Sequence, residues 1–356
     1  MLIIGCDLHP RHQEIAMVNT ETGELVERRL EHENGQAKEF YAGLAGPVRV
    51  GIEATGYTQW FERLLAESGH ELWVGDPAEI RARAVRKQKT NRRDAAHLLD
   101  LLTTGRFPRI WVPSPEERDV RQLLKHRHQL VRMRTSVKNQ LHALAMGQGV
   151  CRKQKLWTPR GRQELERLTL DTWASRRRGE LLELLDRLEP KIAKLDEAVL
   201  AQAKSRPTVV YLMQRQKGVG PVVGLAYVLT LLSVKRFANS RQVVSYLGLN
   251  PSEGSTGDHQ RLGPISKQGN TMMRWLLVEA GQSAAQYDPV LRRTYQRLKF
   301  RRGAKVAKVA LARHLAVRLY WLWREASTEA SARPAPPVRM PGSPAHSMVD
   351  ASPSTL

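Results

Sequence analysis

Short apolar runs of strand length, separated by polar turns, dominate the first 112 residues and limit the folds open to this part of the chain. A helical pattern at Thr58–Ser68 separates the last two runs. Hairpin-like strands followed by alternating strand and helix predict a mixed sheet covered by helices, so residues 1–114 are expected to form an α/β domain. The runs typical of strands are Leu2–Cys6, Glu14–Val18, Glu24–Leu30, Val48–Ile52 and Glu71–Val74.

The pattern becomes helical after residue 114, and a helical, coiled-coil-like linker is expected over residues 115–205. Pro190 falls inside its heptad seam and argues against a long uninterrupted coiled coil. Two interpretations stay open: an amphipathic helix that packs within its own subunit, and a helical hairpin that dimerises. The seam consists of Leu181, Leu185, Leu188, Ile192, Leu195 and Val199.

Residues 206–326 predict a second compact unit, mainly α, in which apolar helices alternate with glycine-rich turns. The composition then changes, because residues 327–356 contain six prolines and no aromatic residue. Such a segment has little apolar surface to bury, so we expect a disordered tail there.

Charge points to a polyanionic partner. The sequence has 57 Lys and Arg against 35 Asp and Glu, a formal net charge of +22. Nucleic acid is the usual partner of such a chain, through counterion release from its phosphates. No apolar run approaches the ~20 residues needed to span a membrane. The first residues lack a basic export signal, and two cysteines make no disulfide framework, so the cytoplasm is the expected location.

Carboxylates follow two of the expected strands. Asp7 closes the first strand and Glu53 closes the fourth, while Asn91 and Asp94 share one face of a helical stretch. Oxygen ligands that converge in this way suit Mg²⁺ (or Mn²⁺) and phosphodiester chemistry. Each acid also has a structural interpretation, as a turn residue, a helix cap or an ion-pair partner. His97 and Asp100 are reserve ligands near the face of Asp94.

Positive charge is dense beside these acids. The stretch is interpreted as a phosphate track, or alternatively as a solvated helix face. Its candidate nucleic-acid contacts are Arg83, Arg86, Lys87, Lys89, Arg92 and Arg93.

Two glycine-rich segments of the second unit carry further candidates. Lys217, Gly218 and Gly220 precede an apolar helix, where they form either a phosphate site or an ordinary interhelical turn. The polar loop 246–270 is long enough to be functional, either catalytic or in contact with substrate. Its hydroxyls and cations are Ser252, Ser255, Thr256, Ser266, Arg261 and Lys267.

These segments together resemble the DEDD transposases of insertion sequences, with the Piv-type DNA invertases and bridge-RNA-guided recombinases as relatives. The motifs are IIGCDLH, GIEATG, KTNRRDA, KGVGP and STG followed by QRLGPISKQGN, and they cover residues 1–326. The resemblance implies an RNase H-like (RuvC-like, Holliday-resolvase-like) N-terminal domain, a helical linker and a C-terminal transposase domain, in a protein of the prokaryotic nucleoid.

The resemblance also implies roles for individual residues. Asp7, Glu53 and Asp94 take the first, second and fourth acidic positions, and Asn91 takes the third in place of an acid. In a shifted register Asp94 would be third and His97 fourth. Mg²⁺ or Mn²⁺ is the implied cofactor.

A serine nucleophile is implied in the C-terminal domain, attacking a DNA phosphate to give a covalent phosphoserine link. Ser255 is favoured over Thr256, because a primary hydroxyl is less hindered. The implied partners are target and donor DNA, a structured guide (bridge) RNA, and further copies of the chain in a dimer or tetramer. The alternatives are a resolvase-like nuclease that uses water, and a non-catalytic nucleic-acid-binding regulator, which Asn91 favours.

Overall fold

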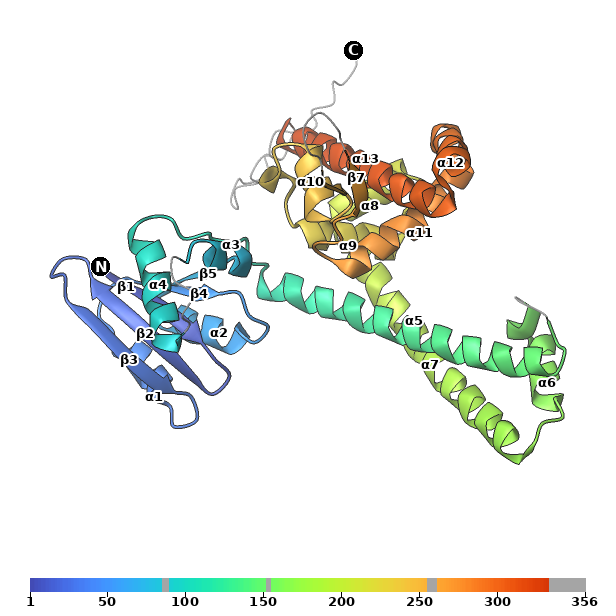
Figure 1. The fold of residues 1–356 in the computed structure, drawn as a ribbon, viewed down its shortest axis with the longest axis horizontal. Coiled ribbons are helices and arrows are strands. Elements are labelled where there is room, and N and C mark those ends of the chain that lie inside the picture. Colours follow the sequence, from blue (N-terminus) through green and yellow to red (C-terminus); the bar gives the residue numbers. More distant parts are fainter. Residues whose placement is uncertain (85–89, 152–154, 255–260, 333–356) are drawn as a thin grey trace, which may run out of the picture. The chain divides into compact units, whose positions relative to one another are not determined.

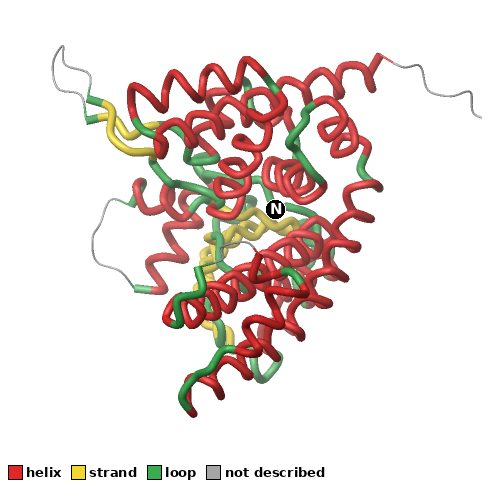
Figure 2. The backbone as a smooth tube through the Cα atoms, turned by 90° about the vertical axis from the view of Figure 1, so that its right-hand side faces the viewer, coloured by secondary structure: helices red, strands yellow, loops and turns green. Residues whose placement is uncertain are grey.

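The computed structural model describes residues 1–84, 90–151, 155–254 and 261–332. The chain divides into two compact units, Met1–Ser114 and Pro115–Leu356. Among the described residues, strands occur in one sheet of the first unit and in a short ribbon of the second, and helices form most of the remainder (Figures 1 and 2).

The first unit contains a mixed five-stranded sheet in the order β3-β2-β1-β4-β5 (Figure 1). β1 pairs antiparallel with β2 and parallel with β4, while β3 and β5 form the two edges. The α/β prediction for this part of the chain is therefore confirmed. The strands are β1 (Leu2–Leu8), β2 (His12–Asn19), β3 (Leu25–Glu31), β4 (Val48–Glu53) and β5 (Glu71–Gly75).

Helices cover both faces of this sheet. On one face Ile4 and Cys6 are buried with Tyr41 of α1 (Gln36–Ala42) and Phe61 of α2 (Gln59–Glu67). On the other face Ile3 packs with leucines of α4 (Asn91–Thr103), and the short α3 (Pro77–Ala82) follows β5. Because side chains alternate along a strand, the odd-numbered residues of β1 face α4.

Two long helices, α5 (Pro115–Gly147) and α7 (Thr172–Lys204), run antiparallel in the second unit (Figure 1). Arg127 of α5 bonds to Asp196 of α7 at 2.7 Å, and further along Arg134 bonds to Glu189 at 3.2 Å. In the sequence, η1 (Lys155–Trp157) and α6 (Pro159–Arg167) connect the two helices. The heptad leucines therefore pack within the subunit.

α7 continues through Pro190, contrary to the expected interruption. Proline removes one helical hydrogen bond and costs ~3 kcal/mol in a helix interior. Here the cost is offset because Leu185, Leu188 and Ile192 on both sides of it are buried against α5 and α6.

Most of the remaining helices enclose one core, into which the first residues of α5 and the last of α7 also pack. Its two buried tyrosines bond to backbone carbonyls, Tyr227 to Ala316 at 2.7 Å and Tyr320 to Phe237 at 3.0 Å. The elements are α8 (Pro207–Arg215), α9 (Pro221–Leu231), η2 (Val234–Arg236), α10 (Ser240–Tyr246), the ribbon β6 (Pro251–Glu253) and β7 (Leu262–Ile265), α11 (Thr271–Tyr287), α12 (Pro289–Arg302) and α13 (Ala304–Ala332).

α13 runs past Ser327, where composition placed the start of the tail. The helix can continue because this segment contains no proline before residue 334. Thr328 Oγ1 donates to the carbonyl of Arg324, one turn back. Among the described helices, none is long and apolar enough to cross a membrane.

Candidate active site

Two carboxylates lie side by side at the ends of adjacent strands. β1 and β4 are parallel with Cys6 opposite Ile52, so Asp7 and Glu53 occupy the next step of the register. Neighbouring strands are ~4.8 Å apart. Both residues also lie on the α4 face, because Gly51, two residues before Glu53, faces Leu102 of α4.

α4 approaches this strand pair unusually closely. A Cβ on Gly5 would lie 2.3 Å from the carbonyl oxygen of Ala95 and 2.4 Å from the backbone nitrogen of Leu99. Only glycine at this position lets the helix backbone lie against β1. The N-terminal half of α4, which contains Asn91 and Asp94, is thereby held against β1, and Asp7 is the last residue but one of this strand.

The side of α4 that carries Asp94 faces the strand ends. His97, three residues further along the same side, places Nε2 3.2 Å from the carbonyl oxygen of Ile80 in α3, just beyond the end of β5. Asn91 precedes Asp94 by three residues and shares its side of the helix. The backbone therefore places Asp7 and Glu53 on neighbouring strands and packs the helix of Asn91 and Asp94 against β1. That these four residues form one site stays a prediction.

The donor types fit a hard divalent cation, since carboxylate and amide oxygens are its preferred protein ligands. Their side chains are not gathered, however: within the described ranges, no three His, Cys, Asp or Glu side chains are close enough to hold a metal ion. Asp7 Oδ2 instead lies 3.0 Å from His9 Nε2. The His97 imidazole is engaged by Ile80, and Asp100 pairs with Arg106 at 3.2 Å, so both reserve ligands have structural partners.

Sequence reasoning missed two polar neighbours of Asp7. Glu14 of β2 pairs directly with Asp7 in the antiparallel register and lies 3.9 Å from Arg29 Nη1. His9 bonds to Asp7 and stacks on His12 at a ring separation of 4.9 Å. The hairpin signal was present, but the register that sets Glu14 beside Asp7 depends on the turn between the strands.

The basic stretch is partly tied to acids on its own unit. Arg83 bonds to Glu79 at 2.9 Å, and Arg92 forms an ion pair with Glu27 of β3. Arg93 is exposed. Exposed pairs of this kind contribute little to stability, so phosphate groups can compete for these cations. Arg86, Lys87 and Lys89 lie outside the described residues.

The turn before α9 has a packing reason for its first glycine. Gly218 has φ 89°, and a Cβ there would lie 2.5 Å from the backbone nitrogen of Ala284 in α11. The interhelical-turn interpretation therefore accounts for Gly218. Gly220 caps α9 without a side chain, and Lys217 is exposed beside it.

The polar loop contains the β6–β7 ribbon, whose base is tightly built. Gly248 has φ 65°, and a Cβ there would lie 2.1 Å from the carbonyl oxygen of Gln268. Arg274 is buried and donates to the carbonyls of Leu247 and Gln268. The residues just before β6 and just after β7 are thus held together at the start of α11.

The hydroxyls of this loop divide into two groups. Ser252 Oγ donates to the carbonyl of Pro264 at 2.9 Å, and Ser266 Oγ donates to Asn250 Oδ1 at 2.9 Å, so both support the ribbon. Ser255 and Thr256, the candidate nucleophiles, fall in the connection between β6 and β7 and lie outside the described residues. The candidate cations Arg261 and Lys267 are exposed on either side of β7.

Comparisons with known proteins identify two matching regions of the chain. A family model described as "Transposase" matches residues 4–147, and one described as "Transposase IS116/IS110/IS902 family" matches residues 210–296. The "Probable family 20 transposase" of Pseudomonas aeruginosa is 30% identical over 332 residues, which cover 89% of this chain and 95% of that protein.

Two further relatives are the transposases for insertion sequence elements IS1111A of Coxiella burnetii and IS1328 of Yersinia enterocolitica. The first is 27% identical over 76% of this chain and 77% of its own length. The second is 24% identical over 79% of this chain and 83% of its own length. All three are named as transposases, a class of DNA-processing proteins. The chain belongs to the IS116/IS110/IS902 family of insertion-sequence transposases, and the resemblance of its motifs is confirmed.

Proposed function

We propose that this transposase moves its insertion sequence by DNA strand exchange, using the acidic edge of the sheet together with a serine of the β6–β7 connection. One observation carries the proposal: Asp7 and Glu53 lie at the ends of adjacent parallel strands, and Gly5 lets α4, whose first turn contains Asp94, pack closely against the first of them. The mixed sheet with helices on both faces supports the RNase H-like interpretation of this unit.

The acidic edge would hold the cofactor. Asp7, Glu53 and Asp94, with the amide of Asn91, are the residues that would ligate Mg²⁺ or Mn²⁺. Such an ion neutralises charge that develops on a reacting phosphate. His9 would position Asp7, since their side chains are 3.0 Å apart.

The serine performs the covalent step. The Oγ of Ser255 attacks the phosphorus of a DNA phosphodiester, an Oγ–P bond forms, and the bond from phosphorus to one sugar oxygen breaks. The serine proton is lost to solvent and the departing sugar oxygen takes up a proton. A sugar hydroxyl of the second DNA then attacks the phosphoserine and regenerates the serine. Two such exchanges between donor and target DNA move the element.

The partners follow from the same proposal. The formal charge of +22 leaves room for target DNA, donor DNA and a structured guide RNA. A homo-oligomer, a dimer or tetramer, would unite acids and serines from its copies at the nucleoid in the cytoplasm.

A covalent-trapping experiment tests the proposal. Labelled donor DNA is incubated with Mg²⁺, the protein and RNA transcribed from the flanking DNA, and the products are run on denaturing gels. We expect a protein–DNA adduct with the wild type and with Thr256→Ala, and none with Ser255→Ala. Asp7→Asn and Glu53→Gln should also abolish it, because the carboxylate charges are lost while the side-chain shapes are kept.

Each alternative gives a different pattern on the same gels. A water-dependent nuclease would still cut DNA when Ser255 and Thr256 are both replaced by Ala. A regulator would bind DNA without cutting it, and Asp7→Asn would change nothing. Adduct formation by Thr256→Ala but not by Ser255→Ala identifies the nucleophile, and the reverse pattern would transfer that role to Thr256. Omission of the RNA tests the guide separately.

A further inference from the structure

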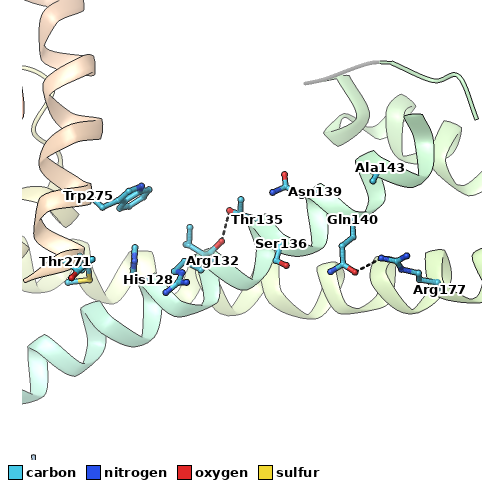
Figure 3. Close-up of a pocket in the computed structure, with 12 residues that line it drawn as sticks. His128, Arg132, Thr135, Ser136, Asn139, Gln140, Ala143, Arg177, Thr271 and Trp275 are labelled. Atoms are coloured by element: carbon cyan, nitrogen blue, oxygen red, sulfur yellow. Dashed lines mark hydrogen bonds between the residues drawn. The ribbon is translucent and has the colours of Figure 1, made fainter. Parts of the chain in front are cut away.

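A hollow of about 770 Å³ lies between α5, α7 and α11, within the second unit (Figure 3). One face of α5 supplies most of its lining, since the residues recur at steps of three and four along the helix. Trp275 and Thr271 of α11 line its other side, and Arg177 comes from α7. The α5 face consists of His128, Val131, Arg132, Thr135, Ser136, Asn139, Gln140 and Ala143.

The aromatic residue of this hollow is open to solvent. Trp275 is 43% exposed, although it sits on a helix whose neighbouring Leu276 and Leu277 are buried in the core. Figure 3 shows its indole extending toward the α5 face, and the His128 ring lies 5.0 Å from it. An indole with a free edge or face can receive a nucleobase, because every base has a π surface.

The charge of the hollow is positive. Arg132 and Arg177 line it, and among the described lining residues none is acidic. The sequence contains no Asp or Glu between Asp119 and Glu164, so α5 is cationic along most of its length. Burial, followed by the nearby Arg132 and Arg127, lowers the pKa of His128, so arginines provide this charge at neutral pH.

Arg132 differs from three other cations of α5, which form ion pairs with acids of α7. Arg127, Arg134 and Lys138 point at α7 and pair with Asp196 or Glu189. Arg132 faces the hollow, where Figure 3 shows it beside His128. Arg177 is held at the far side by a 2.9 Å hydrogen bond to Gln140.

We propose that this hollow binds a single-stranded segment of polynucleotide, with one base on Trp275 and phosphates on Arg132 and Arg177. Thr135, Ser136 and Asn139 lie between the two arginines and supply hydrogen-bonding groups for sugars or base edges. The α5 face runs from His128 to Ala143, fifteen helical steps or about 22 Å, which is the length of roughly six nucleotides at duplex spacing. This inference rests on the proposed function in one respect: it assumes that the protein acts on a polynucleotide.

Fluorescence anisotropy tests this on the full chain. Labelled single-stranded DNA, single-stranded RNA and duplex DNA are titrated with protein in one buffer of fixed salt. Trp275→Ala should weaken single-strand binding about tenfold or more, as loss of one stacked base does. Trp275→Phe should restore most of it. Arg132→Gln should weaken binding further and reduce its salt dependence.

The chain offers a matched control. Trp173 of α7 is 75% exposed and lies 6.0 Å from the Arg176 guanidinium, but it does not line the hollow. Trp173→Ala should leave binding unchanged. Comparing the affinities for single-stranded DNA and single-stranded RNA decides which polynucleotide the hollow prefers. An equal loss of affinity for both in Trp275→Ala still supports the site.

Three results would overturn the inference. Trp275→Ala could leave both single strands bound as tightly as before, or it could weaken duplex binding equally. It could also change the mass measured by light scattering without changing DNA or RNA affinity, in which case the hollow is an interface between copies. All titrations are repeated in Asp7→Asn protein, which removes strand exchange. Polynucleotide binding by the Asp7→Asn protein does not depend on catalysis. The binding site can therefore be disproved without disproving the proposed strand exchange, and the reverse also holds.

Discussion

Gly5 of β1 lies directly against the backbone of Ala95 in α4, with 2.3 Å between its missing Cβ position and the Ala95 carbonyl oxygen. The helix cannot approach the sheet as closely with any other residue. Asp94 adjoins Ala95 and Asp7 is two residues from Gly5, so this contact fixes the backbone of the helix turn with Asp94 against the strand that contains Asp7. One glycine thus links packing of the first unit to its candidate chemistry.

Gly5→Ala should therefore cost both stability and strand exchange. The new methyl group meets backbone atoms, so α4 must move away from the sheet, and such overpacking costs about 1–3 kcal/mol. We expect a lower midpoint of thermal unfolding and a larger fall in adduct formation. Circular dichroism melts and the trapping gels measure the two effects.

Gly51→Ala is the control for this variant. Its Cβ would meet the Leu102 side chain at 2.6 Å, a group that can shift rotamer, rather than backbone. A smaller loss of stability and nearly unchanged chemistry are expected. Equal effects of the two substitutions would mean that the position of α4 does not govern the site.

The strands of the first unit could be predicted because their signal is local. Apolar runs such as Val48–Ile52 are bounded by turn residues, and the acids that end them are visible in the sequence. The close approach of α4 to Gly5 could not be predicted, because a glycine in a strand does not reveal which helix will pack over it. Likewise the Glu14–Asp7 pairing requires the register of the hairpin.

The second unit shows the same division. The heptad leucines of α7 predicted a packed helix, whereas its passage through Pro190 depends on burial against partners distant in sequence. The hollow beside Trp275 could not be foreseen, since its lining comes from three helices, and its α5 and α11 residues are more than a hundred positions apart in the sequence. Its local signal, polar residues at helical spacing on α5, looks the same as a solvated face.

Asn91→Asp should strengthen divalent-cation binding. Asn91 begins α4 on the side of Asp94, and a carboxylate attracts Mg²⁺ more strongly than an amide. Titration with Mn²⁺, followed by its electron paramagnetic resonance signal, should show tighter binding, and adduct formation should reach half its maximum at lower Mg²⁺. Asp100→Asn, on the same helix but paired with Arg106, should change neither. An unaltered Mn²⁺ titration for Asn91→Asp would remove this residue from the ligand set.

Arg274→Met should destabilise the base of the β6–β7 ribbon. The substitution leaves the carbonyls of Leu247 and Gln268 without their charged donor, and a lost bond to a charged group costs about 1.5–3 kcal/mol. Urea unfolding should show the loss, and adduct formation should fall because the base of the ribbon that leads to Ser255 loses this support. Arg292→Met is the control: this exposed arginine also bonds two carbonyls, and a loss as large as that of Arg274→Met would contradict the argument.

Low pH should destabilise the packing of α12 against α13, because it removes the stabilising effect of the Asp288 carboxylate. Its carboxylate accepts from the backbone nitrogens of Val290 and Leu291 at 2.8 and 3.2 Å and pairs with Arg318 of α13. The hydrogen bond from Arg318 is the main cause that lowers the pKa of Asp288. A lowered native pKa contributes stability above the ordinary value of about 3.9, and that contribution is lost as pH falls through the native pKa.

Two substitutions separate the cap of α12 from this charge. Asp288→Asn keeps the cap and loses the ion pair, so it should cost less than Asp288→Ala, which also loses the cap and about 1 kcal/mol with it. Urea unfolding at pH 7 and pH 3 measures both. The difference in unfolding free energy between wild type and Asp288→Asn should narrow at pH 3, below the ordinary pKa, because unfolding of the wild type then takes up a proton. Asp171, at the start of α7, makes no side-chain capping bond within the described residues. Asp171→Asn is therefore the control, and its difference in stability from wild type should be the same at pH 7 and pH 3. A gap that is the same at both pH values would mean that the ion pair with Arg318 contributes nothing to stability.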